Sequence, residues 1–223
     1  MALVCSLNVG TALPLATRAG RSGIDKVPTD GPVVVGPPGP GGPGGSGLAG
    51  DAICDTAHHG GDDQAVYAYA REDLDHWQDR LGEALRPGTF GENLTTIGLD
   101  VTGARLGERW RVGRDVLLEV TTPRIPCATF QVWMGREGWV RDFTRAGRPG
   151  AYLRVLTGGA VHSGDPVVVE ERPGHGVTIG LAFRALTLEP ALLPSLLEAG
   201  DHLVDDLRRR AEAHAGDDWS VVS

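Results

Sequence analysis

Cysteine and lysine are scarce in this sequence, and long apolar runs are missing. Its 223 residues include only three cysteines, Cys5, Cys54 and Cys127, an odd number spread too widely for a disulfide framework. None of them forms a CxxC pair, so the usual zinc and iron–sulfur spacings are absent. No apolar stretch approaches the roughly 20 residues that cross a bilayer, and the N-terminus does not read as a secretory signal. We therefore expect a protein of the reducing cytoplasm.

Positive charge is also in deficit. The chain has 21 Lys and Arg against 29 Asp and Glu, a formal net charge of −8. Binding along a phosphate backbone draws on clustered positive charge, so the balance argues against a general nucleic-acid binder but leaves room for a small basic pocket. Lys26 is the only lysine, and a GC-rich genome explains that bias without any functional meaning.

Short strands separated by glycine and proline dominate most of the chain. Alternating apolar residues and turn signals predict strands at 2–9, within 22–35 (two short ones), at 104–113 and 116–120, at 150–156 and at 165–170. The strands 104–113 and 116–120 are expected to form a hairpin that turns at 113–115. Residues 36–47 are almost entirely glycine and proline, which predicts a flexible insertion.

Helical periodicity marks two long regions, and a further helical turn is expected at 139–143. Residues 65–85 carry apolar side chains at spacings of three and four, which predicts the main internal helix, with Asp62 or Asp63 capping its start. Three further helices are expected at 178–186, 189–199 and 203–215, the first capped by Thr178. The pattern predicts a mainly β, α+β fold. A closed or folded-over antiparallel sheet would occupy residues 1–175, and a helical extension residues 176–223.

A stiff corner follows the strand at 116–120. Pro123 and Pro126 fix the backbone there and remove two amide donors, and Arg124 and Cys127 emerge from the same corner. A guanidinium favours the thiolate, which is the form of cysteine that binds metals or attacks electrophiles. The alternative is that Cys127 is a small buried apolar residue and Arg124 forms an ordinary surface ion pair.

Polar residues in two other segments also admit two interpretations. The His58–His59 doublet precedes glycines, so its imidazoles lie on a backbone that can approach a ligand closely. Alternatively, Asp51 or Asp55 orients one histidine for folding reasons alone. Asn93 carries a donor and an acceptor, which suits the edge of a heterocycle or closes an Asx turn.

Taken together, these segments resemble the MOSC-domain family, named for the C-terminal domain of molybdenum cofactor sulfurases. The likeness is greatest to its stand-alone bacterial branch with extra C-terminal helices. The segments that carry the resemblance keep the family's order and lie at 6–10, 23–28, 47–51, 58–61, 90–94, 123–127 and 164–167. The insertion at 36–47 and Asp63 depart from the family pattern.

The resemblance implies a β-barrel-like domain that binds the molybdenum cofactor, molybdenum held by molybdopterin. It implies that Cys127 is the protein ligand to molybdenum and a catalytic residue, a role in which a thiolate suits a soft metal environment. The other site residues expected on this basis are His58 and His59 beside the reacting centre, and Lys26, Arg124, Asn93, Gly60 and Thr129 as cofactor contacts.

The implied activity is reduction of N-hydroxylated compounds such as N-hydroxylated purines, hydroxylamines and amidoximes. The chain has neither a cysteine set for an iron–sulfur cluster nor a GxGxxG fingerprint after a strand, so we expect electrons from a separate flavoprotein or ferredoxin-type partner. We expect a monomer or homodimer. The alternative is a non-catalytic module that carries sulfur as a Cys127 persulfide or passes the cofactor on.

Overall fold

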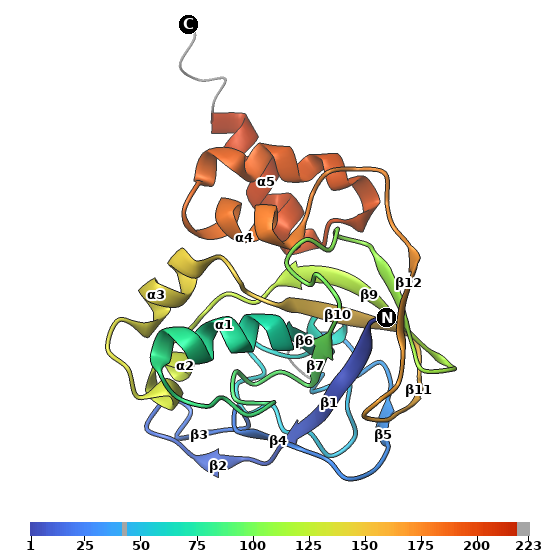
Figure 1. The fold of residues 1–223 in the computed structure, drawn as a ribbon. Coiled ribbons are helices and arrows are strands. Elements are labelled where there is room, and N and C mark those ends of the chain that lie inside the picture. Colours follow the sequence, from blue (N-terminus) through green and yellow to red (C-terminus); the bar gives the residue numbers. More distant parts are fainter. Residues whose placement is uncertain (42–43, 218–223) are drawn as a thin grey trace, which may run out of the picture.

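The computed structural model describes residues 1–41 and 44–217 and places the strands in one body, with the C-terminal helices gathered over one end and the other helices beside the strands (Figure 1). In chain order the strands are β1 (Leu3–Gly10), β2 (Leu13–Pro14), β3 (Arg21–Ser22), β4 (Lys26–Pro28), β5 (Val33–Val35), β6 (Val66–Ala70), β7 (Leu94–Ile97), β8 (Arg109–Val112), β9 (Val116–Pro123), β10 (Ala151–Thr157), β11 (Gly159–Val161) and β12 (Val167–Glu171). The helices are η1 (Asp62–Gln64), α1 (Arg71–Leu81), α2 (Ala128–Met134), α3 (Trp139–Ala146), α4 (Ile179–Thr187), η2 (Pro190–His202) and α5 (Asp205–Asp217).

One large sheet forms the body. Its eight strands run in the order β12-β8-β9-β10-β6-β7-β1-β4, and an isolated bridge between Leu3 and Pro166 joins β1 to the segment before β12. The Val167 amide also donates to the Ala2 carbonyl at 3.0 Å, so the sheet folds round and closes on itself. The predicted mainly β, α+β fold is confirmed. The sheet is mixed rather than antiparallel, because β6 and β7 are parallel and α1 forms the crossover between them.

The helix predicted over 65–85 is wrong in its first part. Residues Val66–Ala70 form β6, a strand in the middle of the sheet in which every residue is buried, and α1 begins only at Arg71. A strand covered on both faces shows no alternation, so its apolar run merges with the helical pattern that follows. The predicted cap is wrong as well, because Asp62 and Asp63 belong to η1 and Ala70 precedes α1 without a side-chain cap.

Most elements that were predicted from a local turn or cap signal are present in the structure. The β8–β9 hairpin is confirmed, with Val112 opposite Val116. Thr178 caps α4 by accepting a hydrogen bond from the Leu181 amide at 3.1 Å. The next predicted helix is instead the 3-10 segment η2, which contains Pro194, a residue that cannot donate to a regular helical ladder. Helix α2, immediately after Cys127, was not predicted.

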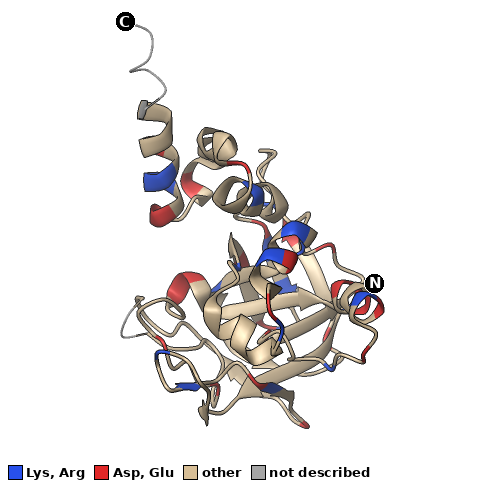
Figure 2. Cartoon of the chain, turned by 90° about the vertical axis from the view of Figure 1, so that its left-hand side faces the viewer, with Lys and Arg blue, Asp and Glu red and all other residues tan. Residues whose placement is uncertain are grey.

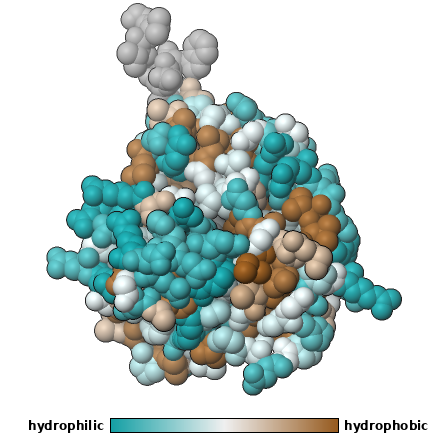
Figure 3. All heavy atoms as spheres, in the orientation of Figure 1, coloured by the Kyte–Doolittle hydropathy of each residue, from teal (hydrophilic) through white to brown (hydrophobic). Residues whose placement is uncertain are grey.

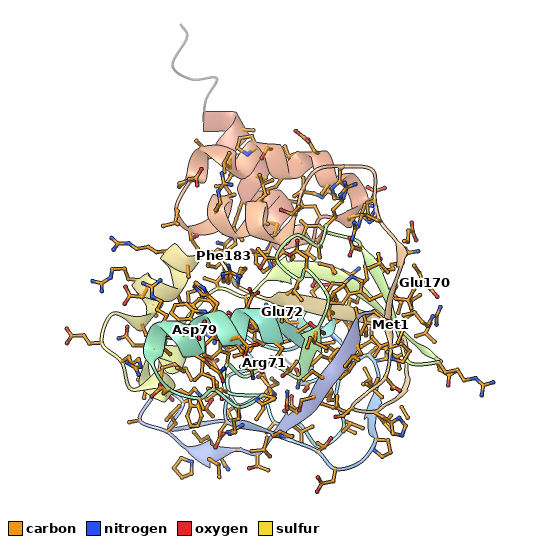
Figure 4. The ribbon with its side chains drawn as sticks, in the orientation of Figure 1. Met1, Arg71, Glu72, Asp79, Glu170 and Phe183 are labelled. Carbon is orange, nitrogen blue, oxygen red and sulfur yellow. The ribbon has the colours of Figure 1, made fainter. Side chains whose placement is uncertain are left out.

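Two apolar clusters hold these elements together. The larger fills the barrel and includes residues of α4, η2 and α5. The smaller is aromatic and packs α1, α2 and α3 together around Trp77, Phe90, Phe130 and Phe143. Phe183 of α4 belongs to it and lies between the C-terminal helices and the barrel (Figure 4). The helices thus share a core with the barrel, and the division after residue 175 stays a prediction.

The surface mixes charges of both signs. Figure 2 shows basic and acidic positions interspersed over the body and the C-terminal helices. Another face combines a broad hydrophilic area with a smaller apolar patch (Figure 3). In residues 1–41 and 44–217 no helix combines the length and the apolar character needed to cross a membrane.

Candidate functional site

A pocket beside the corner after β9 collects residues that lie far apart in the sequence. Lys26 and Arg124, nearly a hundred positions apart, line it together with the Cys127 thiol. The remaining predicted residues on its wall are Asn93, His59, Gly60 and Thr129. Of the predicted set, His58 alone is not on its wall.

The corner after β9 positions the two central groups. Strand β9 ends at Pro123, and Cys127 has the extended conformation of an N-cap before α2, whose Gln131 amide donates to the Cys127 carbonyl at 3.2 Å. Phe130, fully buried in the aromatic cluster, fixes the first turn of α2. The rigid corner therefore holds Arg124 and Cys127 on the wall of the same pocket.

The Cys127 thiol has an altered acidity. Burial raises the pKa of the Cys127 thiol, but a hydrogen bond from His59, the charge of Arg124 and the Phe130 amide act against burial and together lower it to about 6. Its microenvironment is therefore that of a reactive cysteine at neutral pH, since a low pKa in an accessible, electropositive setting favours the thiolate. The interpretation of Cys127 as an inert apolar residue is not supported by this environment.

Arg124 is a buried cation that pairs with no carboxylate among the described residues. Its residue is 4% exposed, and its guanidinium carbon lies 3.7 Å from the centre of the Phe130 ring. In the described part of the chain no ion pair includes Arg124, and its Nη1 atom has no hydrogen-bond partner. The alternative of a surface ion pair is thus wrong. An unpartnered, buried guanidinium on a pocket wall is a fork suited to an anionic ligand.

Lys26 is buried too, but its charge is compensated. Its ammonium forms an ion pair with Asp51, whose side chain is inaccessible. Burial lowers the pKa of Lys26, with the Asp51 carboxylate opposing that effect. Asp51 also accepts from the Gly10 amide at 2.7 Å and from Asn93 Nδ2 at 3.0 Å. Lys26 is therefore a buried, paired residue of β4 and not a solvated one.

Asn93 lines the pocket, yet its amide serves the fold. Its Oδ1 accepts from the Tyr67 amide at 3.1 Å, and its Nδ2 donates to the Asn8 carbonyl at 3.3 Å as well as to Asp51. Asn93 thereby ties β1, β6 and Asp51 together. This arrangement differs from an Asx turn and leaves little free capacity for the edge of a heterocycle.

The two histidines of the doublet lie in different surroundings. His59 lines the pocket and donates the hydrogen bond to Cys127 described above. His58 is exposed, with 69% of its side chain accessible, and its Nδ1 lies 3.0 Å from Asp55. Asp55 therefore orients His58, as the structural alternative for the doublet predicted. Only His59 is placed next to the thiol.

The Gly/Pro-rich insertion contacts the glycines that follow the histidine doublet, Gly60 and Gly61. The Gly61 amide donates to the Gly45 carbonyl at 3.0 Å, and a Cβ added at Gly60, whose φ is 81°, would lie 2.7 Å from that same oxygen. Gly60 is therefore fixed by close backbone approach. Residues 42–43 of the insertion lie outside the described residues, and the flexibility of 36–47 stays a prediction.

Sequence reasoning missed several residues on the pocket wall. Tyr67, Tyr152, Cys54 and Gln64 line it, and burial raises the pKa of both tyrosines, which keeps their hydroxyls neutral. Asp51 was considered only as a residue that orients a histidine and as part of the segment 47–51 that resembles the family, not as the partner of Lys26. Nothing local marks the others, because they come from separate elements.

The donor set fits an anionic ligand that brings its own metal. Within residues 1–41 and 44–217 no group of three or more His, Cys, Asp or Glu side chains could hold a metal ion by itself. Two thiols, those of Cys54 and Cys127, lie on the pocket wall, and Cys127 is the one with a lowered pKa beside Arg124, whose Nη1 atom has no hydrogen-bond partner. A pterin dithiolene with a phosphate would use the Cys127 thiolate and Arg124, since thiolate suits a soft metal and guanidinium suits phosphate.

Comparison with known proteins places the chain in a family. Residues 55–168, half of the chain, match the MOSC domain. An uncharacterised Bacillus subtilis protein, YflK, is 33% identical over 135 residues, which are 60% of this chain and 61% of YflK. A Gibberella moniliformis protein named "Reductase" is 34% identical over 179 residues, 71% of this chain and 29% of that protein. The chain thus spans less than two thirds of the length of these relatives.

Solved structures of related proteins have the same fold as this chain. YiiM from Geobacillus stearothermophilus has a TM-score of 0.76 and 26% identity, and the match covers 96% of this chain and 99% of YiiM. YiiM from Escherichia coli has the same fold, with a TM-score of 0.72 at 22% identity over 97% of this chain and 94% of that one. With the match over residues 55–168, these findings establish that the chain belongs to the MOSC domain family.

Proposed function

We propose that this protein binds the molybdenum cofactor and reduces N-hydroxylated compounds, with Cys127 as the protein ligand to molybdenum. The observation that carries the proposal is the pairing of a thiol of lowered pKa with the unpartnered, buried guanidinium of Arg124 in one pocket. Membership of the MOSC family, which is associated with this cofactor, supports it, as does the relative named "Reductase".

Each residue of the pocket has a distinct part in this proposal. The Cys127 thiolate would hold the metal, and Arg124 would donate charge-assisted hydrogen bonds to the cofactor's phosphate. Asp51 holds Lys26 and Asn93 in place on the pocket wall. When bound, the cofactor supplies two-electron chemistry at the N–O bond.

The chain's own contribution to turnover is protons and positioning. Reduction of R–NHOH to R–NH₂ and water consumes two electrons and two protons. His59, beside the Cys127 sulfur, is the titratable group placed to hold a proton at the reacting centre. The electrons come from a separate flavoprotein or ferredoxin-type donor.

Metal and pterin analysis tests the proposal. Protein purified from cofactor-competent cells is expected to contain stoichiometric molybdenum and pterin, and to oxidise a reduced viologen dye when an N-hydroxylated compound is added. Cys127→Ser should lose the metal while remaining folded, because serine is a poor ligand in a soft site. Cys5→Ser is the matched control, since Cys5 is exposed and outside the pocket, whereas Cys54 lines it.

The same assay addresses the carrier alternative, which the lowered pKa of Cys127 also favours because a thiolate readily takes up sulfur. A Cys127 persulfide in protein that lacks molybdenum, detected by mass spectrometry, would replace the reductase proposal with a sulfur carrier. Equal molybdenum content in Cys127→Ser and the wild type would remove Cys127 from the metal site.

A further inference from the structure

Tyr152 lies where two pockets meet. Its strand, β10, is placed between β9 and β6 (Figure 1), and Tyr152 is paired with Thr122 of β9 and Tyr67 of β6. Tyr152 lines the pocket that contains Cys127, and it also lines a second pocket, whose wall runs from the corner after β9 to α5. The register of the sheet therefore places Tyr152 beside the corner that carries Cys127.

The hydroxyl of Tyr152 differs from those of the other two tyrosines. Tyr67 Oη donates to the Pro149 carbonyl at 2.7 Å, and Tyr69 Oη donates to the Arg148 carbonyl at 2.9 Å. Within residues 1–41 and 44–217 the Tyr152 hydroxyl donates to no acceptor, yet it is not one of the inaccessible polar atoms that lack a partner, and the residue is partly exposed. The proton of Tyr152 is therefore available to a molecule in the pocket.

The groups around this hydroxyl keep its proton in place and favour its transfer. Burial of most of the side chain raises the pKa of Tyr152, the charge of Arg124 opposes that effect, and Cys127 adds to it. From β6, the Tyr67 ring packs against the Tyr152 ring with centres 5.1 Å apart. A guanidinium has donors only, so Arg124 cannot accept the Tyr152 proton but would stabilise the phenolate that its transfer leaves behind.

We propose that Tyr152 is a proton donor of this site, which donates a hydrogen bond to the oxygen of a bound N-hydroxylated compound and protonates it as the N–O bond breaks. The inference rests on the proposed function for the identity of the reaction. Reduction of R–NHOH takes two electrons from the separate donor and two protons, one for the nitrogen and one for the oxygen. Tyr152 supplies the proton of the oxygen, which leaves as water, and the phenolate regains a proton from water in the second pocket. The His59 proton is already engaged with the Cys127 sulfur, so the two residues have different roles.

Removal of the hydroxyl alone tests this inference. Tyr152→Phe keeps the ring that packs against Tyr67, so the molybdenum content should be unchanged, while kcat for benzamidoxime near pH 7.5 should fall at least about hundredfold, as for the loss of a general acid. Tyr69→Phe is the matched control, because it removes a tyrosine hydroxyl that is hydrogen-bonded within the fold, and Tyr69 lines neither pocket. Tyr152→Leu, which also lacks the hydroxyl, takes the place of Tyr152→Phe if that variant fails to fold.

The effect of pH on kcat separates proton donation from support of the site. Wild-type Tyr152 keeps its proton at neutral pH, whereas Tyr152→Phe must take the proton from solvent acid, whose concentration falls as the pH rises. The ratio of wild-type to Tyr152→Phe kcat should therefore rise with pH, because groups that titrate in both proteins cancel in the ratio. A constant ratio, or an equal kcat in the two proteins at normal molybdenum content, overturns the role of Tyr152 and leaves the proposed function intact.

Direct binding keeps this inference separate from the proposed function, because equilibrium dialysis of benzamidoxime needs no turnover. Its dissociation constant should rise about fivefold in Tyr152→Phe, in line with one lost hydrogen bond, and stay near the wild-type value in Tyr69→Phe. If the protein contains no molybdenum and reduces no N-hydroxylated compound, the proposed function fails, but weaker binding by Tyr152→Phe alone still supports Tyr152 as the donor to the ligand's oxygen. Equal binding by Tyr152→Phe and the wild type overturns the inference.

Discussion

The acidity of Cys127 gives the sharpest quantitative prediction. With a pKa of about 6, the thiol is about ten-to-one thiolate at pH 7, whereas an ordinary cysteine with a pKa near 8.5 is only about 3% thiolate. Because the thiolate is the form that is alkylated, the rate of modification by iodoacetamide should rise with pH through a midpoint near 6 and reach a plateau by about pH 8. The midpoint, not the plateau rate, is the quantity to compare.

The assay needs Cys127 as the sole thiol. A Cys5→Ser/Cys54→Ser background provides it, and peptide mass spectrometry across about pH 5 to 9 gives the rate at each pH. In that background His59→Ala removes a hydrogen bond to the sulfur, so the midpoint should move up toward the ordinary value near 8.5. A wild-type midpoint already near 8.5, or an unchanged midpoint in His59→Ala, would refute the electrostatic reasoning.

The lowered pKa of Cys127 also predicts how the free energy of unfolding changes with pH. The pKa of Cys127 is lower in the folded state than the roughly 8.5 of an unfolded cysteine, so the thiolate's stabilising contribution is full above about pH 8.5 and is lost as the pH falls through about 6. Urea unfolding of the wild type and Cys127→Ser should therefore differ in favour of the wild type by more at pH 9 than at pH 5. A difference that does not vary with pH contradicts the assignment.

Three further predictions follow from the pocket wall. Arg124→Ala and Arg124→Lys should each reduce cofactor retention about tenfold or more, measured as molybdenum content after dialysis, because lysine keeps the charge but not the fork. Lys26→Ala should lower the free energy of unfolding by about 3 kcal/mol, because it leaves Asp51 buried without its partner, and a Lys26→Ala/Asp51→Ala double variant should recover part of that loss. Gly60→Ala should lower the melting temperature, because its Cβ would meet the Gly45 carbonyl.

How much of the fold could be predicted depended on whether the signal was local. The β8–β9 hairpin and the Thr178 cap are specified by residues within a few positions of one another, and both are confirmed. The strand β6 was missed because its residues are buried on both faces, an arrangement that depends on neighbours distant in sequence. The parallel pairing of β6 with β7 could not be read from either strand alone.

The candidate site shows the same contrast between residues with a local signal and residues that only the fold brings together. Pro123 and Pro126 mark a rigid corner in the sequence itself, and the structure has Arg124 and Cys127 on that corner. Asp51 was missed as the partner of Lys26 because the two are 25 positions apart and meet only through the sheet.

A second pocket, which adjoins the first at Cys127, could not be predicted from the sequence at all. Its wall combines loops before β6, the corner after β9 and two C-terminal helices, α4 and α5. The histidine doublet also could not be interpreted from the sequence alone. Two adjacent residues can face different surroundings, and only the fold determines that His59 contacts the thiol while His58 contacts Asp55.

The two cations of the pocket differ in a way that decides how an anion would bind. Lys26 already has the Asp51 carboxylate as counter-charge, so an anion that approached it would compete with a buried ion pair. Arg124 has no carboxylate partner among the described residues, its charge is opposed by the Cys127 thiolate whose pKa it lowers, and its Nη1 atom has no hydrogen-bond partner. An anionic ligand can therefore accept a hydrogen bond from Arg124 without displacing a buried ion pair. We therefore expect the phosphate of the proposed cofactor at Arg124, whereas Lys26, Asp51 and Asn93 satisfy one another on the pocket wall.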